Sequence, residues 1–110
     1  MNDDVILEVQ AGACQFKTVV IGSLCEDGHV DLRIKSECPM VRKMAARMPE
    51  FDPVDAASMR LHENPVIIHA GNHLSHPACP VPVAIIKVLE SSSGMAVKKD
   101  VTMHYCPSSR

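Results

Sequence analysis

The stretch His76–Pro82 combines residues suited to chemistry with a local structure that would activate them. Its sequence, HPACPVP, runs into the apolar segment 83–90. Proline is tolerated in the first turn of a helix, where its missing N–H has no intrahelical partner, so Pro80 and Pro82 predict a helix start. Cys79 would then lie at a helix N-terminus. The helix dipole lowers the pKa of a thiol there and favours the thiolate, which is the form that binds metals or attacks electrophiles.

Two more cysteines occur where an element begins or turns. Cys38 precedes Pro39, which predicts a second helix start, and Cys14 is the last residue of the tight turn 11–14. Thiolate and imidazole ligands suit zinc, and three or four thiolates suit iron–sulfur clusters. We therefore expect a zinc or iron–sulfur site whose ligands are Cys14, Cys38 and Cys79, with His76 or a small molecule completing the shell.

Two other hypotheses remain open from the residues alone. In the first, the protein is a metal-free thiol enzyme or redox protein in which Cys79 is the nucleophile, Cys38 resolves it and His76 is the base. In the second, the chain is a structural or interaction domain whose cysteines are buried and inert, as free cysteines often are. The sequence does not decide whether the protein is an enzyme, and it assigns no role to Cys25, Cys106, His69 or His73.

Several runs carry the patterns of strands and helices. Short β-branched or alternating runs predict strands at 5–10, 16–24, 29–36, 66–69 and 101–105, with Asp27-Gly28 as a hairpin turn. Proline-started segments predict a helix from Pro39 to near Pro49, a short helical piece at 53–59 and a helix from Cys79 to near Gly94. These elements predict an α/β (α+β) fold, a single compact domain over residues 1–110 with a mixed, mostly antiparallel sheet of four or five strands packed by two main helices. Residues 106–110 are expected to be a frayed tail.

The expected alternation of these elements brings the cysteines together. Packed elements usually reverse direction across short connections, so the 11–14 turn, Cys38 and Cys79 fall at one rim, with Cys25 at the opposite end. A strand at 66–69 would bring His69, His73 and His76 to the same rim. The final strand would carry Cys106 toward it.

Composition excludes several classes of function. The 110 residues are 3% aromatic with a net charge of -2, which disfavours nucleic acid binding because single strands are held by aromatic platforms in basic grooves. No apolar run approaches a membrane span and the first residues are acidic, so we expect neither a membrane association nor an export signal. Five cysteines without such a signal predict reduced thiols in a cytoplasmic protein. An exposed edge strand makes a homodimer a reasonable expectation.

Four segments also resemble a known group of proteins: 11–16 (AGACQF), 36–39 (SECP), 76–82 (HPACPVP) and 99–101 (KDV). They are similar to a family of small uncharacterised proteins from methanogenic archaea and other anaerobes, over roughly residues 9–103. The resemblance implies cysteines at the positions of Cys14, Cys38 and Cys79, with no counterpart for Cys25 or Cys106. It brings no activity, but an anaerobic setting would make an iron–sulfur cluster easier to maintain.

Overall fold

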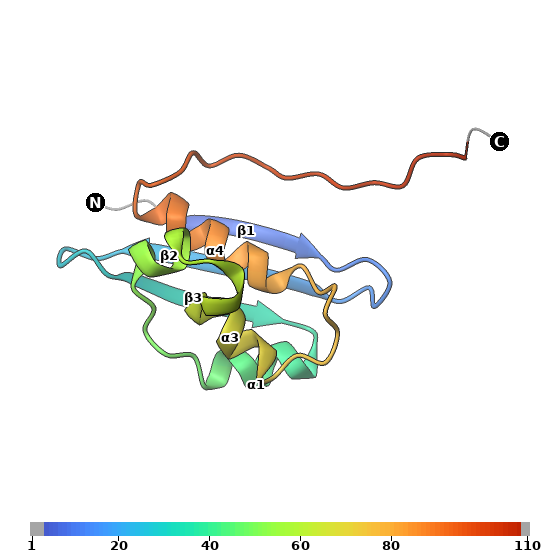
Figure 1. Ribbon diagram of the computed structural model, residues 1–110, viewed down its shortest axis with the longest axis horizontal. Helices are drawn as coiled ribbons and strands as arrows, with labels where there is room; N and C mark the ends of the chain where they lie inside the picture. Colours follow the sequence, from blue (N-terminus) through green and yellow to red (C-terminus); the bar gives the residue numbers. More distant parts are fainter. Residues whose placement is uncertain (1–3, 109–110) are drawn as a thin grey trace.

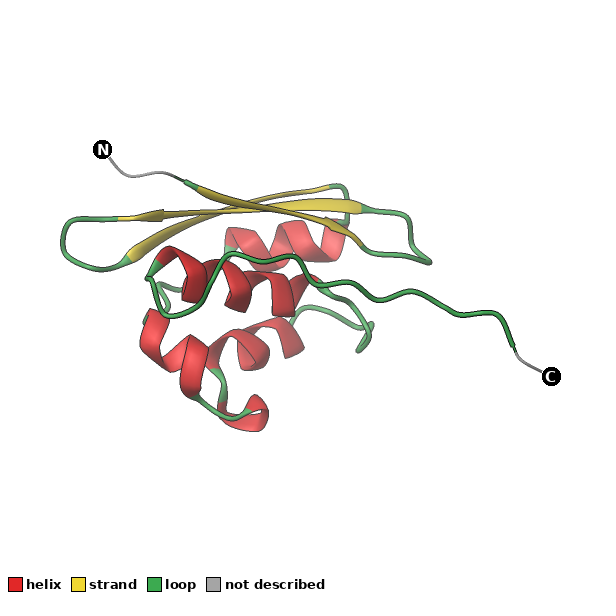
Figure 2. Ribbon diagram, turned by 90° about the horizontal axis from the view of Figure 1, so that it is seen from above, coloured by secondary structure: helices red, strands yellow, loops and turns green. Residues whose placement is uncertain are grey.

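A computed structural model describes residues 4–108 as a three-stranded sheet covered on one face by helices (Figures 1 and 2). The strands are β1 (Val5–Gln10), β2 (Lys17–Leu24) and β3 (Val30–Ser36), joined as an antiparallel meander in the order β1-β2-β3. The register pairs Leu7 with Val20 and Val20 with Ile34. The two hairpins therefore match the prediction from sequence.

Four α-helices and one 3-10 turn follow the sheet. They are α1 (Pro39–Ala46), α2 (Pro53–Ser58), η1 (Leu61–Glu63), α3 (Pro65–Gly71) and α4 (Val81–Ser92). Each α-helix has a proline in its first turn, where the missing N–H costs no intrahelical hydrogen bond. None of the helices within residues 4–108 has the length and apolar character needed to cross a membrane.

The predicted sheet of four or five strands is wrong, because the described residues form three strands and the sheet is entirely antiparallel. The segment 66–69 lies in α3. Its β-branched residues favour a strand, but Asn64 caps the helix by accepting a hydrogen bond from the Val66 N–H at 3.0 Å, and Pro65 occupies the first turn. Asn64 is itself buried and donates to the carbonyl oxygen of Ala56 at 2.9 Å, which fixes this cap in the core.

The predicted last strand, 101–105, is also absent. The chain leaves α4 at Gly94, which adopts a positive φ of 83°, and continues as an extended segment that pairs with no strand of the described chain (Figure 1). Alternating residues form a strand only when a neighbouring strand accepts their backbone hydrogen bonds, and none lies beside this segment.

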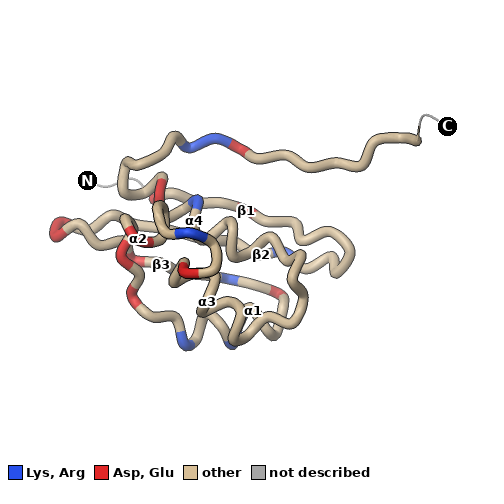
Figure 3. The backbone as a smooth tube through the Cα atoms, in the orientation of Figure 1, with Lys and Arg blue, Asp and Glu red and all other residues tan. Residues whose placement is uncertain are grey.

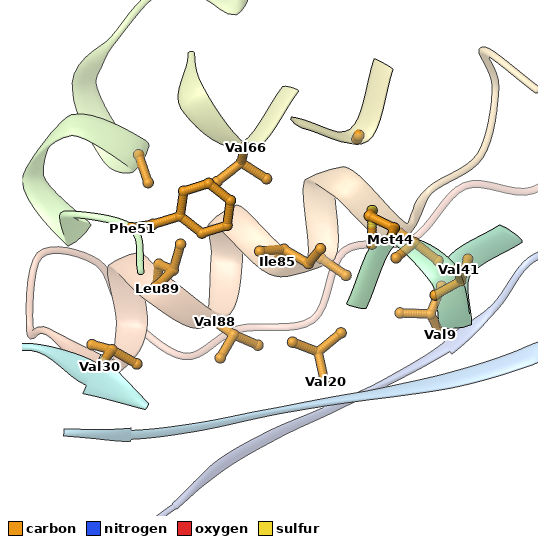
Figure 4. Close-up of a cluster of buried hydrophobic side chains, with 14 residues drawn as sticks. Val9, Val20, Val30, Val41, Met44, Phe51, Val66, Ile85, Val88 and Leu89 are labelled. Atoms are coloured by element: carbon orange, nitrogen blue, oxygen red, sulfur yellow. The ribbon is translucent and has the colours of Figure 1, made fainter. Parts of the chain in front are cut away.

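Helix α4 forms the centre of the core. Its buried side chains recur at helical spacing, from Val81 through Ile85 to Val88 and Leu89, and they meet residues from the sheet and from the other helices (Figure 4). Val20 packs from β2, Met44 from α1 and Val66 from α3. The helix therefore lies between the sheet and the helices α2 and α3, while α1 packs against β3.

The sheet approaches α4 most closely at Gly22. A Cβ added to Gly22 would lie 2.5 Å from the Ser92 hydroxyl oxygen and 2.5 Å from Val88 Cγ1. Gly22→Ala should lower the free energy of unfolding by about 1–3 kcal/mol, the usual cost of overpacking a core. Gly71→Ala is the matched control, because nothing lies within 4 Å of its added Cβ. Chemical denaturation of both variants would measure the difference, and equal stabilities would contradict the close packing of α4 on β2.

Candidate cysteine pocket

A pocket of about 280 Å³ opens at the end of the molecule where the β1–β2 turn, the start of α1 and the loop before α4 meet. All three of these segments lie at the right in Figure 1. The pocket brings together Cys14, Cys38, Cys79 and His76, the four residues that the sequence nominates. The remaining lining residues are apolar apart from one threonine: Ala11, Ala13, Phe16, Thr18, Met40, Val41, Leu74, Ala78 and Val81.

Cys14 lies on the exposed β1–β2 turn. The turn is closed by hydrogen bonds from the Ala11 N–H to the Phe16 carbonyl oxygen at 3.2 Å and from the Gln15 N–H to the Gly12 carbonyl oxygen at 2.9 Å. Gly12 and Gln15 both have positive φ, a conformation that costs glycine little and glutamine more. Cys14 is thus presented to solvent at the mouth of the pocket.

Cys38 is held more firmly, at the N-cap position of α1. Its N–H donates to the Ser36 hydroxyl at 3.0 Å, and its carbonyl accepts the first helical hydrogen bond from the Arg42 N–H at 3.0 Å. The Ser36 hydroxyl in turn contacts that of Thr18, a fully buried residue of β2, at 2.7 Å. The Cys38 side chain is half-buried against the core.

Cys79 is half-buried on the opposite wall, and its environment differs from the prediction. Burial raises the pKa of the Cys79 thiol above its ordinary value; a hydrogen bond from the Val81 N–H opposes this, and negative charge at Cys38 and at Cys14 raises the pKa further. The expectation of a lowered pKa is therefore wrong. Helix α4 begins at Val81, after Pro80 as N-cap, so the cysteine precedes the helix, and desolvation outweighs the hydrogen bond from the Val81 N–H.

His76 lies on the same loop and is exposed. Its carbonyl oxygen accepts a hydrogen bond from the Cys79 N–H at 3.1 Å, which closes the turn that carries both residues. The imidazole is therefore positioned by the same short turn as the thiol.

The other nominated histidines and cysteines lie elsewhere. His69 Nε2 lies 3.0 Å from the Met44 carbonyl oxygen and so joins α3 to the end of α1, whereas His73 Nδ1 lies 3.0 Å from the carbonyl oxygen of His69, four residues earlier in the chain. Neither histidine lines the pocket, and the predicted strand that was to bring them to the cysteines is part of the helix α3. Cys25 contacts the Ser23 carbonyl oxygen from the opposite hairpin, and Cys106 is exposed in the C-terminal segment.

Met40 is a pocket residue that the sequence did not identify. Its spacing with Met44 and Met48 predicts a core face of α1, yet its side chain lines the pocket and its sulfur accepts a hydrogen bond from the Ser75 hydroxyl at 3.2 Å. This bond ties the loop before α4 to the first turn of α1. The only signal in the sequence is its position two residues after Cys38.

The arrangement supports thiol chemistry but contains no completed metal site. No group of three or more histidine, cysteine or acidic side chains in residues 4–108 is placed closely enough to hold a metal ion. None of the five cysteines is in a disulfide. Any occupant held by all three pocket cysteines would therefore require them to move closer together.

Comparison with known proteins gives one match. The profile of a family of unknown function (DUF6951) matches residues 5–105, which include the sheet, the four α-helices and the pocket. No curated protein and no solved structure matches the chain. The prediction of kinship with an uncharacterised family is confirmed at that level.

The pKa of Cys79 gives a direct test of the pocket. In metal-free protein, the rate of Cys79 alkylation should rise with pH through a midpoint above that of an ordinary thiol, while Cys14, which is exposed, should react faster. Cys38→Ser removes a negative charge near Cys79 and should lower its midpoint. Cys25→Ser, at the opposite end, should leave it unchanged. Mass spectrometry of the alkylated peptides measures all of these rates. An unchanged midpoint for Cys79 in Cys38→Ser would show that Cys38 is too far from Cys79 to affect its ionisation, and would contradict a shared pocket.

Proposed function

The chain belongs to the family of unknown function DUF6951, and we propose that its cysteine pocket binds a thiolate-ligated metal centre, either a zinc ion or an iron–sulfur cluster. Cys14, Cys38 and Cys79 would be the ligands, with His76 or a small molecule completing the shell. The observation that supports this most strongly is that three cysteines from three separate elements line one pocket. Packing against the core accounts for the positions of Cys38 and Cys79 but not for that of Cys14, which does not contact the core.

The donors around the pocket favour this class of metal. The lining contains three thiols, a thioether and an imidazole but no carboxylate. Calcium and magnesium require oxygen donors, whereas thiolates select zinc and iron–sulfur clusters. The donor set therefore argues for a soft or borderline metal.

Electrostatics argue in the same direction. Negative charge at Cys38 and Cys14 opposes the ionisation of Cys79. A bound cation reverses this relation, because it is the largest local charge and deprotonates the thiols that coordinate it. The cluster of thiols is thus unfavourable as three thiolates alone and favourable as three thiolates around a metal.

Of the three cysteines, Cys14 has the greatest freedom to move toward a metal. Cys38 and Cys79 each precede a proline and are half-buried, so their positions follow the helices. Cys14 lies on an exposed turn and can approach them without disturbing the core. With three protein ligands, one coordination position remains for His76 or an external ligand, which is the arrangement of reactive rather than closed structural zinc sites.

The metal-free alternative receives less support. A thiol enzyme that uses Cys79 as nucleophile and His76 as base needs a substantial fraction of thiolate near neutral pH. The raised pKa of Cys79 works against this. A Cys38–Cys79 redox pair would show itself as a disulfide that forms on oxidation of the metal-free protein.

Metal content tests the proposal directly. Anaerobically purified protein should contain zinc or show the absorption of an iron–sulfur cluster. Serine substitution of Cys14, Cys38 or Cys79 should remove most of the metal, because each takes away one of three ligands. Cys25→Ser is the matched control and should retain it, since Cys25 lies on the opposite hairpin. Elemental analysis and absorption spectra would decide, and metal-free wild-type protein that also fails to take up zinc or cluster on reconstitution would refute the proposal.

Proton release provides an independent measure. Metal binding requires thiolates. The affinity for zinc should therefore fall by about tenfold for each unit by which the pH is lowered, for each ligand thiol that is protonated before binding. The raised pKa of Cys79 extends this dependence above the ordinary thiol range. Calorimetric zinc titrations in buffers of different ionisation enthalpy would count the protons, and binding that is independent of pH between 6 and 9, ~3 units that span the thiol range, would exclude thiolate ligation.

A further inference from the structure

The C-terminal segment 97–105 exposes apolar side chains that no other part of residues 4–108 covers. Val97 is 83% exposed, Val101 62% and Met103 85%, and Tyr105 is fully exposed. Both ribbon views show the segment leaving the body of the molecule (Figures 1 and 2). Large apolar residues exposed together on a monomer generally mark an interaction surface.

The pattern of this segment is that of a strand without a partner. Val101, Met103 and Tyr105 alternate with Thr102 and His104, so one face would be apolar. No lysine, arginine, aspartate or glutamate occurs between 101 and 105, as Figure 3 shows beyond the charged cluster 98–100. The family profile extends to residue 105, which makes the segment part of the matched region.

The sheet offers two edges, and β1 is the better match. The order β1-β2-β3 leaves β1 and β3 each with one unpaired side. β3 exposes one acidic residue, Asp31, and two basic residues, Arg33 and Lys35, so its net positive charge would repel the Lys98-Lys99 pair at the start of the segment. β1 exposes Glu8 and an apolar residue, Ile6, which is 62% exposed. Charge and hydrophobicity therefore both select β1.

The geometry favours a second copy over the same chain. Within one chain, only 97–100 lies against the start of β1, in a small recess shared with α4. The segment then runs in the same direction as its own β1 (Figure 1). Pairing in that chain would be parallel, whereas a two-fold axis allows the antiparallel pairing found throughout this sheet.

We propose that the segment 101–105 of one copy pairs with the free edge of β1 in a second copy, and reciprocally, to form a two-fold symmetric dimer. The reciprocal exchange would cover Val101, Met103 and Tyr105 and would satisfy two open sheet edges at once. This inference is independent of the metal centre, because neither the segment 101–105 nor β1 lines the cysteine pocket.

The test is the mass of the full chain in solution under reducing conditions, which exclude disulfide-linked dimers. Light scattering coupled to size-exclusion chromatography should give a dimer. The triple variant Val101→Ser, Met103→Ser, Tyr105→Ser should be monomeric, and so should Ile6→Lys. The control Thr102→Ala, His104→Ala changes the opposite face of the segment and should remain dimeric.

Two further outcomes would overturn the proposal. A wild-type protein that is monomeric at all accessible concentrations would exclude pairing between copies. This result is also expected if the segment pairs with β1 of its own chain. A dimer that survives the triple variant would use another surface. Circular dichroism of each variant should match the wild type, because all substituted positions are exposed. Isotope-filtered NMR contacts between labelled and unlabelled copies, at 101–105 and β1, would confirm the pairing if exchange occurs.

Discussion

The burial of α4 is the constraint on which the rest of the structure depends. A three-stranded sheet has too little surface to enclose a core by itself, so a helix must cover one face. Ile85, Val88 and Leu89 are fully buried because the sheet lies on one side of α4 and the helices α2 and α3 pack on its other side. The position of this helix also fixes the loop that precedes it, and with that loop the half-buried wall of the cysteine pocket.

The pocket illustrates how a small fold separates stability from chemistry. The buried core is aliphatic and uses no cysteine, while the pocket sulfurs come from a turn and from two positions that precede a helix. Cys38 and Cys79 are partly buried and pack against the surface of the core, whereas Cys14 is exposed. Desolvation at the core side of the pocket is the main reason that the pKa of the Cys79 thiol is raised.

The elements were predictable where local signals agree. Asp27-Gly28 gives a hairpin, and the prolines at 39 and 53 give helix starts, as expected. Pro65 carries the same signal, but the β-branched residues after it suggested a strand, and only the buried amide of Asn64 shows why the helix prevails. The last strand was wrong for a different reason. Alternation at 101–105 describes one partner of a strand pair, and a sequence does not reveal whether a second partner exists in the same chain.

The partial burial of Cys38 and Cys79 has a consequence for the protein in the cell. A ligand bound by Cys14, Cys38 and Cys79 would join the first hairpin to the beginnings of α1 and α4, regions far apart along the polypeptide. Ligands that bind only the native state shift the balance between native and denatured molecules in proportion to their supply. The amount of intact protein would then follow the availability of whatever fills the pocket, and scarcity would expose the chain to degradation.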